Sequence, residues 1–177
     1  MVLKNSTHRW LFFFFIAGML VSLFLTYEHF SPEASKWCTF GSSFDCGIVN
    51  KSPYANLDGI SYLLTVDFGW NISLINLTQY GFVADLLTSN AFLGFLTLLF
   101  LFLLLKAYQR DKRFLWVRPN KALAWMQGIL IFGVVYGSYL FLIQHFLLKT
   151  YCLFCLALDV VLIASLTIVW RLHHYRQ

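Results

Sequence analysis

Long apolar runs separated by short polar stretches dominate this sequence. Four of the runs approach the roughly 20 residues that a helix needs to cross the hydrocarbon core of a bilayer. They lie at about residues 10–29, 82–107, 122–148 and 151–170. The pattern predicts an all-α integral membrane protein, a four-transmembrane-helix bundle formed as a single domain by residues 1–177. We expect residues 30–90 to form a long outer loop or cap between spans one and two.

The long loop contains two shorter apolar stretches, 57-LDGISYLLTVDFGW-70 and 80-YGFVADLLTSN-90. Each is too short to cross a bilayer, and runs of that length more often lie in the interface or pack as a cap. We expect both to form short helices over the outer end of the bundle.

The first run resembles a signal peptide at its start, because Lys4, His8 and Arg9 precede it. The run is long, however, and the segment 27-YEHFSPEASKW-37 that follows it has no small-x-small cleavage site. We therefore interpret it as a retained span.

Composition supports a membrane protein. The chain is 59% hydrophobic and only 12% charged, whereas soluble domains carry about 25% charged residues. The formal net charge is +5, but the basic residues sit in short clusters between the apolar runs, as membrane topology requires. This distribution argues for contact with membrane lipid and against nucleic acid as a partner.

The basic clusters also predict orientation. Lys and Arg are concentrated before the first run, between the second and third, and after the fourth, at Lys4, Arg9, Lys106, Arg110, Lys112, Arg113, Arg118, Lys121, Arg171 and Arg176. Because positively charged segments stay inside, both termini of this multi-pass protein should be cytoplasmic. The segment 28–90 and the connector at Lys149 should lie in the periplasm, the extracellular space or the ER lumen.

This topology gathers all four cysteines at the outer face. Cys38 and Cys46 fall on the long loop, and Cys152 and Cys155 form a C-x-x-C at the start of the fourth run. Oxidising compartments permit disulfides.

The C-x-x-C has distinctive surroundings. Cys152 and Cys155 share one helix face near the helix N-terminus, whose partial positive charge favours a reactive thiolate. Asp159 lies one turn further along the same face. A carboxylate in a membrane helix is a functional hypothesis by default. Asp159 has two possible roles: it can shuttle protons, or it can pair with a hydroxyl or amide of a neighbouring helix.

The cysteines allow three interpretations. Cys38 and Cys46 can form a structural bridge. A four-cysteine zinc site would need a second short spacing, and the loop cysteines are separated by seven residues, so we expect no metal. Alternatively, two dithiol pairs on one face of a membrane can exchange electrons by attack of thiolate on disulfide. The loop pair would then meet a soluble partner, and the helix pair an acceptor in the bilayer, most simply a quinone.

The arrangement resembles the vitamin K epoxide reductase family. The matching pieces are Cys38, the run 44-FDCGIVNKSPYANLDG-59, the stretch 89-SNAFLG-94 and 152-CLFC-155. The resemblance implies an enzyme, a quinone-linked thiol oxidoreductase. Because the sequence stops at Gln177, we expect a stand-alone member without a fused thioredoxin domain.

The resemblance also implies roles for the cysteines. Cys38 would exchange with a thioredoxin-like redox protein at the outer face. Cys46 would pass electrons between Cys38 and Cys152. Cys155 would react with the quinone, which is menaquinone, ubiquinone or vitamin K.

Three further residues are implicated in quinone binding. Ser52 matches the family serine near the quinone, and Asn90 looks like the asparagine that hydrogen-bonds a quinone oxygen in animal members. Asp159 stands where animal members have a tyrosine, and Asn50 where they have a phenylalanine. Both changes make the pocket more polar and favour quinone-dependent disulfide bond formation of the bacterial DsbB type. Asn90 and the long cap favour reduction of vitamin K quinone or its epoxide.

Two other classes of membrane protein are alternatives to this interpretation. A non-enzymatic four-span scaffold protein would also brace its outer loops with disulfides, but has no need for a C-x-x-C beside Asn90 and Asp159. A small transporter would use polar groups in the membrane, and the third run offers only Gln127, Gln144 and His145.

Overall fold

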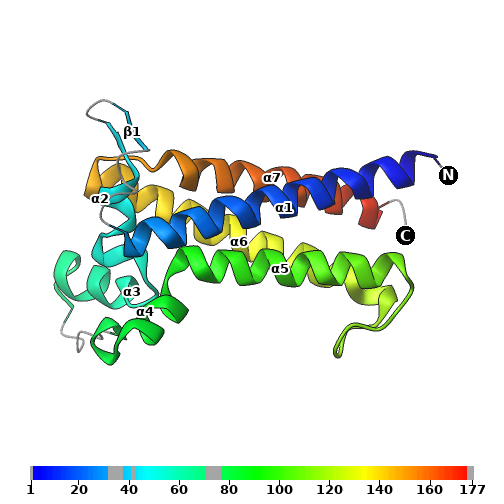
Figure 1. The fold of residues 1–177 in the computed structure, drawn as a ribbon, viewed down its shortest axis with the longest axis horizontal. Coiled ribbons are helices and arrows are strands. Elements are labelled where there is room, and N and C mark those ends of the chain that lie inside the picture. The colour runs from blue at the N-terminus through cyan, green and yellow to red at the C-terminus, as the bar shows by residue number, and fades with distance from the viewer. Residues whose placement is uncertain (1, 32–37, 41–42, 71–76, 175–177) are drawn as a thin grey trace.

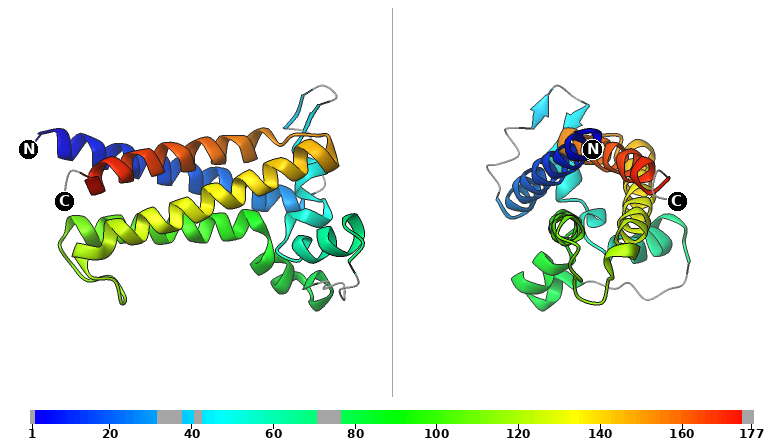
Figure 2. Two further views of the ribbon diagram at one scale, coloured as in Figure 1. Left: turned by 180° about the vertical axis from the view of Figure 1, so that it is seen from behind. Right: turned by 90° about the vertical axis from the view of Figure 1, so that its right-hand side faces the viewer.

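A computed structural model describes residues 2–31, 38–40, 43–70 and 77–174. Four long helices lie side by side, and the end-on view in Figure 2 shows them arranged around one axis. They are α1 (Val2–Phe30), α5 (Asn90–Gln109), α6 (Ala122–Ile143) and α7 (Leu153–His174) (Figure 1). Each is long and apolar enough to cross a membrane. The predicted all-α four-span membrane bundle is therefore confirmed.

The second span starts later than its apolar pattern indicates. Ser89 has an extended backbone, and its hydroxyl accepts a hydrogen bond from the Phe92 amide (3.2 Å), so it caps the start of α5. The preceding residues form a separate helix, α4 (Phe82–Thr88). Where the pattern indicates one span over residues 82–107, the structure has a short helix followed by a spanning helix that begins at Asn90.

The third and fourth spans meet at a tight turn. α6 continues into a π-helical turn, η6 (Gln144–Leu148), and then Lys149 adopts a left-handed conformation with φ 51°. A left-handed residue is a common way to end a helix. α7 begins at Leu153, which lies between the two cysteines of the C-x-x-C rather than before them.

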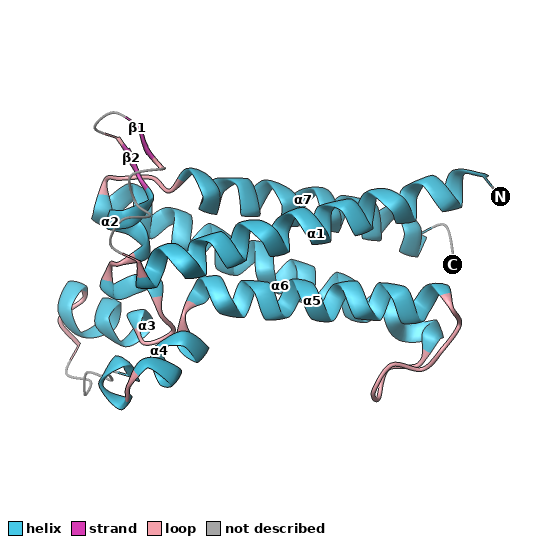
Figure 3. Cartoon of the chain, viewed as in Figure 1, coloured by secondary structure: helices cyan, strands magenta, loops and turns pink. Residues whose placement is uncertain are grey.

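Short elements cover one end of the bundle (Figure 3). They are β1 (Thr39–Phe40), β2 (Phe44–Asp45), α2 (Cys46–Asn50), η2 (Pro53–Ala55), α3 (Gly59–Tyr62), η3 (Leu63–Asp67), η4 (Leu77–Tyr80) and α4. A further 3₁₀ turn, η5 (Pro119–Lys121), precedes α6. The two short helices expected in the long loop correspond to α3 with η3, and to α4. Both chain ends and the α5–α6 connector lie at the opposite end (Figure 1).

The larger of two apolar clusters in the described residues is contributed by the four long helices and the α5–α6 connector. Its buried members are Leu11, Phe15, Leu98, Leu101, Leu104, Leu105, Val117, Ala122, Leu123, Met126, Leu130 and Val169. The outward faces are also apolar: Leu20, Phe132 and Val160 are 64%, 70% and 65% exposed. Large exposed apolar surface of this kind is characteristic of helices that face lipid.

Close approach of α1 to its neighbours depends on Gly18. A Cβ at this position would lie 2.8 Å from Leu98 Cδ1 on α5 and 3.3 Å from Val161 Cγ1 on α7. Small residues allow helix backbones to pack closely within a membrane. Gly128 on α6, by contrast, has open space where its Cβ would be.

We therefore predict that Gly18→Val destabilises the bundle, whereas Gly128→Val does not. Overpacking of a close interface typically costs about 1–3 kcal/mol. Thermal unfolding in detergent, followed by tryptophan fluorescence, measures the difference. Both variants carry the same change in helix propensity, so equal unfolding temperatures would show that Gly18 is not a packing contact.

Candidate active site

A two-stranded hairpin brings the loop cysteines together. β1 pairs antiparallel with β2, with Thr39 opposite Asp45. Cys38 directly precedes β1 and Cys46 directly follows β2, so their Cα atoms lie 5.5 Å apart and the two are joined by a disulfide. The Asp45 carboxylate accepts a hydrogen bond from the Ile48 amide (3.0 Å), which starts α2 at Cys46.

The second pair stands at the beginning of α7. Cys152 and Cys155 are joined by a disulfide, with Cα atoms 5.2 Å apart. The Cys155 amide lies 3.1 Å from Cys152 Sγ, and the Cys152 amide donates to Gln144 Oε1 (2.8 Å) in a buried hydrogen bond. The π-helical turn that contains Gln144 therefore holds the first cysteine of the pair.

The hairpin is attached to the chain just before the C-x-x-C. Phe44 forms a parallel bridge with Tyr151. The Tyr151 amide donates to the Ser43 carbonyl, and its own carbonyl accepts from the Asp45 amide, each at 3.0 Å. Cys46 and Cys152 are the residues that directly follow Asp45 and Tyr151. Two main-chain hydrogen bonds therefore hold the two cysteine pairs in a fixed relation.

Burial distinguishes Cys155 from the other three cysteines. Cys38, Cys46 and Cys152 are fully buried and pack in one cluster with Leu25 of α1. Cys155 packs against this cluster but is only partly buried, and it also lines a cavity between the helices. It thus stands between the buried cysteines and the cavity.

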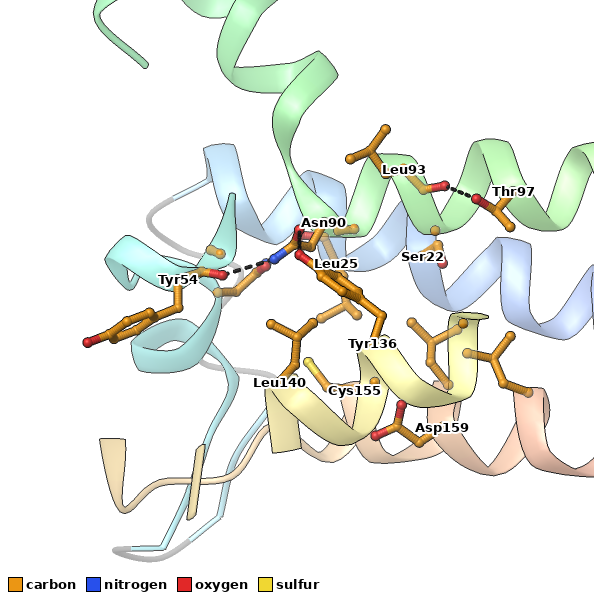
Figure 4. Close-up of a pocket in the computed structure, with 18 of the residues that line it drawn as sticks. Ser22, Leu25, Tyr54, Asn90, Leu93, Thr97, Tyr136, Leu140, Cys155 and Asp159 are labelled. Atoms are coloured by element: carbon orange, nitrogen blue, oxygen red, sulfur yellow. Dashed lines mark hydrogen bonds between the residues drawn. The ribbon is translucent and has the colours of Figure 1, made fainter. Parts of the chain in front are cut away.

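The cavity has a volume of about 340 Å³, within the size range of small-molecule sites. α1, α5, α6, α7 and the segment from Val49 to Leu57 form its mainly apolar wall. Its polar side chains are Ser22, Asn50, Ser52, Tyr54, Asn90, Thr97, Tyr136, Gln144, Cys155 and Asp159. In Figure 4, Cys155 and Asp159 lie on α7 and Asn90 enters from the start of α5.

Asn90 is held by two hydrogen bonds. Its amide nitrogen donates to the Tyr54 carbonyl (2.9 Å), and its amide oxygen accepts from the Tyr136 hydroxyl (2.8 Å) (Figure 4). A primary amide carries two N–H donors, and one of them is used here. Within the described residues, the second N–H of Asn90 makes no hydrogen bond.

Asp159 occupies space that a glycine leaves open. A Cβ on Gly137 of α6 would run into the Asp159 carboxylate. The carboxylate lines the cavity, and none of the side-chain hydrogen bonds of the described residues involves it. The alternative that Asp159 pairs with a hydroxyl or amide of a neighbouring helix is therefore not seen.

Ser52 and Asn50 lie on the cavity wall, and each side chain donates a hydrogen bond to a main-chain carbonyl. The Ser52 hydroxyl donates to the Val49 carbonyl (2.7 Å), and the Asn50 amide donates to the Leu25 carbonyl of α1 (2.6 Å). The oxygen of Ser52 remains able to accept a hydrogen bond. Asn50 connects α2 to α1.

The structure adds two tyrosines that sequence reasoning did not select. Tyr136 lies within the third apolar run. Its hydroxyl was the available signal of a site residue, because a hydroxyl inside a membrane span needs a hydrogen-bond partner. Tyr54 is buried within η2, one of the short elements that cover the bundle, and its hydroxyl donates to Asp67. Burial and this hydrogen bond to a carboxylate raise the pKa of Tyr54 above its ordinary value, so it stays protonated.

Within residues 2–31, 38–40, 43–70 and 77–174, no three His, Cys, Asp or Glu side chains gather as a metal site. Each of the four cysteines is instead joined to another cysteine. What the arrangement offers is two adjacent disulfides, one of which reaches a mainly apolar cavity.

Comparison with known proteins agrees with this chemistry. The model of the Vitamin K epoxide reductase family matches residues 9–170, which is nearly the whole chain. No individual curated protein matches the chain well enough to be named as a relative. The family implies a membrane oxidoreductase that acts on thiols and is linked to quinone. With its four spans and two cysteine pairs, this chain belongs to the vitamin K epoxide reductase family.

Proposed function

We propose that this protein passes electrons from a soluble thioredoxin-like protein to a quinone through its two cysteine pairs. The observation that carries the proposal is the position of Cys155. It lines the mainly apolar cavity, while its partner Cys152 packs in the cluster that contains Cys38 and Cys46. A disulfide that contacts both a second disulfide and an apolar cavity is suited to transfer between them.

The cavity fits a quinone ring. A mainly apolar wall suits the ring, and the free N–H of Asn90 suits one of its oxygens. Ser52 offers an acceptor nearby, which suits a quinol hydroxyl. Menaquinone, ubiquinone and vitamin K all share this ring chemistry, so the wall does not favour one of them.

Each cysteine then has one task. Cys38 exchanges with the soluble partner, and Cys46 transfers the electrons to Cys152. Cys155, as the thiolate released from Cys152, delivers them into the cavity. Because Cys38 is fully buried, exchange with a soluble protein requires the β1–β2 hairpin to move away from the bundle.

Quinone reduction also consumes protons, and Asp159 is positioned to supply one. Its carboxyl group lines the same cavity one helical turn beyond Cys155, in the space left by Gly137. General acid catalysis requires a proton donor within reach of the reacting oxygen. Asp159 makes no side-chain hydrogen bond within the described residues, which leaves its carboxyl group available for this task.

Orientation follows from charge. Both chain ends and the basic α5–α6 connector lie at the end of the bundle opposite the cysteines (Figure 1). The positive-inside rule then makes the termini cytoplasmic. The cysteine end faces the periplasm, the extracellular space or the ER lumen, where a thioredoxin-like partner is accessible.

Two versions of the activity differ in their purpose. In one, the partner is oxidised so that it can form disulfides in other proteins. In the other, vitamin K quinone or its epoxide is the substrate. We favour the first, because Asn50 and Asp159 both lie on the cavity wall and make it more polar.

Cysteine variants test the relay. We predict that Cys155→Ala abolishes quinone reduction with every thiol donor, because no other cysteine lines the cavity described here. Cys38→Ala should lose reduction driven by reduced thioredoxin but keep part of that driven by dithiothreitol, which is small enough to reach the helix pair. Anaerobic assays with menaquinone, ubiquinone and vitamin K epoxide as separate acceptors measure both rates and separate the two versions.

The scaffold interpretation makes the opposite prediction. It requires that neither variant changes any redox rate, while expression and membrane insertion are normal. Wild-type turnover in Cys155→Ala would therefore contradict the relay and leave the scaffold as the better account.

A glycine pair tests the role of Asp159. We predict that Gly137→Ala slows quinone reduction at least tenfold, because the added methyl group displaces the Asp159 carboxylate; general acid catalysis is typically worth about 10²-fold or more. Gly133→Ala, one turn earlier on α6, places its Cβ 3.5 Å from Leu162, an ordinary contact, and should turn over normally. Equal rates in the two variants would exclude a role for the carboxylate position.

A further inference from the structure

We propose that Glu28 exchanges protons with the loop pair, Cys38 and Cys46, during thiol–disulfide exchange. This inference rests on the proposed function, which assigns the loop pair a redox role but leaves its protons without a carrier. Glu28 lies near the end of α1. It is fully buried, and neither carboxyl oxygen has a hydrogen-bond partner in the part of the chain that the structure describes.

Such a group is costly to keep. A buried polar group without a hydrogen bond destabilises the fold, and a buried charge does so much more. Polar groups in membrane helices are functional candidates for this reason. Packing does not account for a carboxyl group here, since an apolar side chain would fill the same space at lower cost.

Two contacts place Glu28 beneath the segment that begins with Cys46. The Asn50 amide donates to the Leu25 carbonyl (2.6 Å), and the Lys51 ammonium donates to the Ser31 carbonyl (3.2 Å). α2 is therefore attached to α1 before Glu28, and Lys51 is attached to the residue that follows α1. Leu25, three residues before Glu28 and on the same helix face, packs directly in the cluster with Cys38, Cys46 and Cys152.

The neighbouring charged groups already have other contacts. Asp45 and Lys51 are close enough to act electrostatically on Glu28. The Asp45 carboxylate caps α2, and Lys51 donates to the Ser31 carbonyl. The next residue, His29, pairs with Asp85 at 3.3 Å. Glu28 is thus the nearby carboxyl group that is free to take up and release a proton.

The Glu28 carboxylate accepts the proton of the Cys46 thiol, and the Cys46 thiolate attacks Cys152 Sγ. The Cys46–Cys152 bond forms, the Cys152–Cys155 bond breaks, and Cys155 leaves as a thiolate. Cys38 then attacks Cys46, which restores the loop disulfide, and its proton passes to the released Cys152. The loop pair is oxidised and the helix pair reduced by two electrons; of the two protons, one rests on Glu28 and one on Cys152.

The test measures reduction of the loop disulfide by dithiothreitol, the reverse chemistry, with alkylation and mass spectrometry to resolve each pair. Attack on Cys38 releases Cys46 as a thiolate, which takes its proton from Glu28. We expect Glu28→Gln to slow this reaction about 10²-fold, as is typical for loss of a general acid. The ratio of the wild-type reduction rate to that of Glu28→Gln should fall as the pH rises and Glu28 loses its proton. Glu28→Asp should restore part of the rate and the same direction of pH dependence.

Controls separate chemistry from structure. In the Cys38→Ala/Cys46→Ala background, Glu28→Gln should leave reduction of the helix pair unchanged. Its thermal unfolding temperature should equal or exceed that of the wild type, because a neutral amide replaces a buried acid. Should Glu28→Gln fail to fold, Glu28→Leu, which also lacks a carboxyl group, takes its place: a wild-type rate and pH profile in this variant overturns the inference.

The outcome does not depend on quinone. Selective slowing of the loop pair supports the role of Glu28 even if the wild-type protein reduces no quinone, in which case only the proposed function fails. Wild-type exchange rates in Glu28→Gln overturn this inference and leave the quinone relay untouched.

Discussion

Main-chain pairing between Phe44 and Tyr151 holds the redox groups of this protein together. The hydrogen bonds from Asp45 to Tyr151 and from Tyr151 to Ser43 connect a loop hairpin to the start of the fourth span. Without them, the loop cysteines would belong to a surface hairpin and the C-x-x-C to a membrane helix. With them, Cys46 and Cys152 share one buried cluster.

The membrane imposes the second constraint, which is that polar groups inside the bundle need partners or a function. Asn90 meets this demand through Tyr54 and Tyr136, and Asn50 through a carbonyl of α1. The carboxyl groups of Glu28 and Asp159 make no hydrogen bonds within the described residues. Asp159 lines the cavity, whereas Glu28 lies on α1 between the two carbonyl groups that bind Asn50 and Lys51.

Much of the fold follows from the sequence, because the thickness of the bilayer fixes how long an apolar run must be. The four spans and the short cap helices were predictable on this basis, but the start of the second span was not, since it depends on a local cap at Ser89. The selected site residues Asn90, Asp159 and Cys155 all line one cavity, while their roles stay predictions. Tyr136 could not be paired with Asn90, 46 residues away, from the pattern alone. Nor could Glu28 be distinguished from an ordinary polar residue at the end of a span, because its burial depends on how the α2 segment lies across α1.

The central claim is that the two cysteine pairs exchange electrons, although only one of them reaches the cavity. The most direct test is an anaerobic titration of the fully reduced protein with quinone, following quinol formation by absorbance and each cysteine by alkylation. The account predicts that each protein molecule reduces two quinones, because both cysteine pairs pass their electrons to quinone through Cys155. Reduction of a single quinone, with Cys38 and Cys46 still present as thiols, would contradict it.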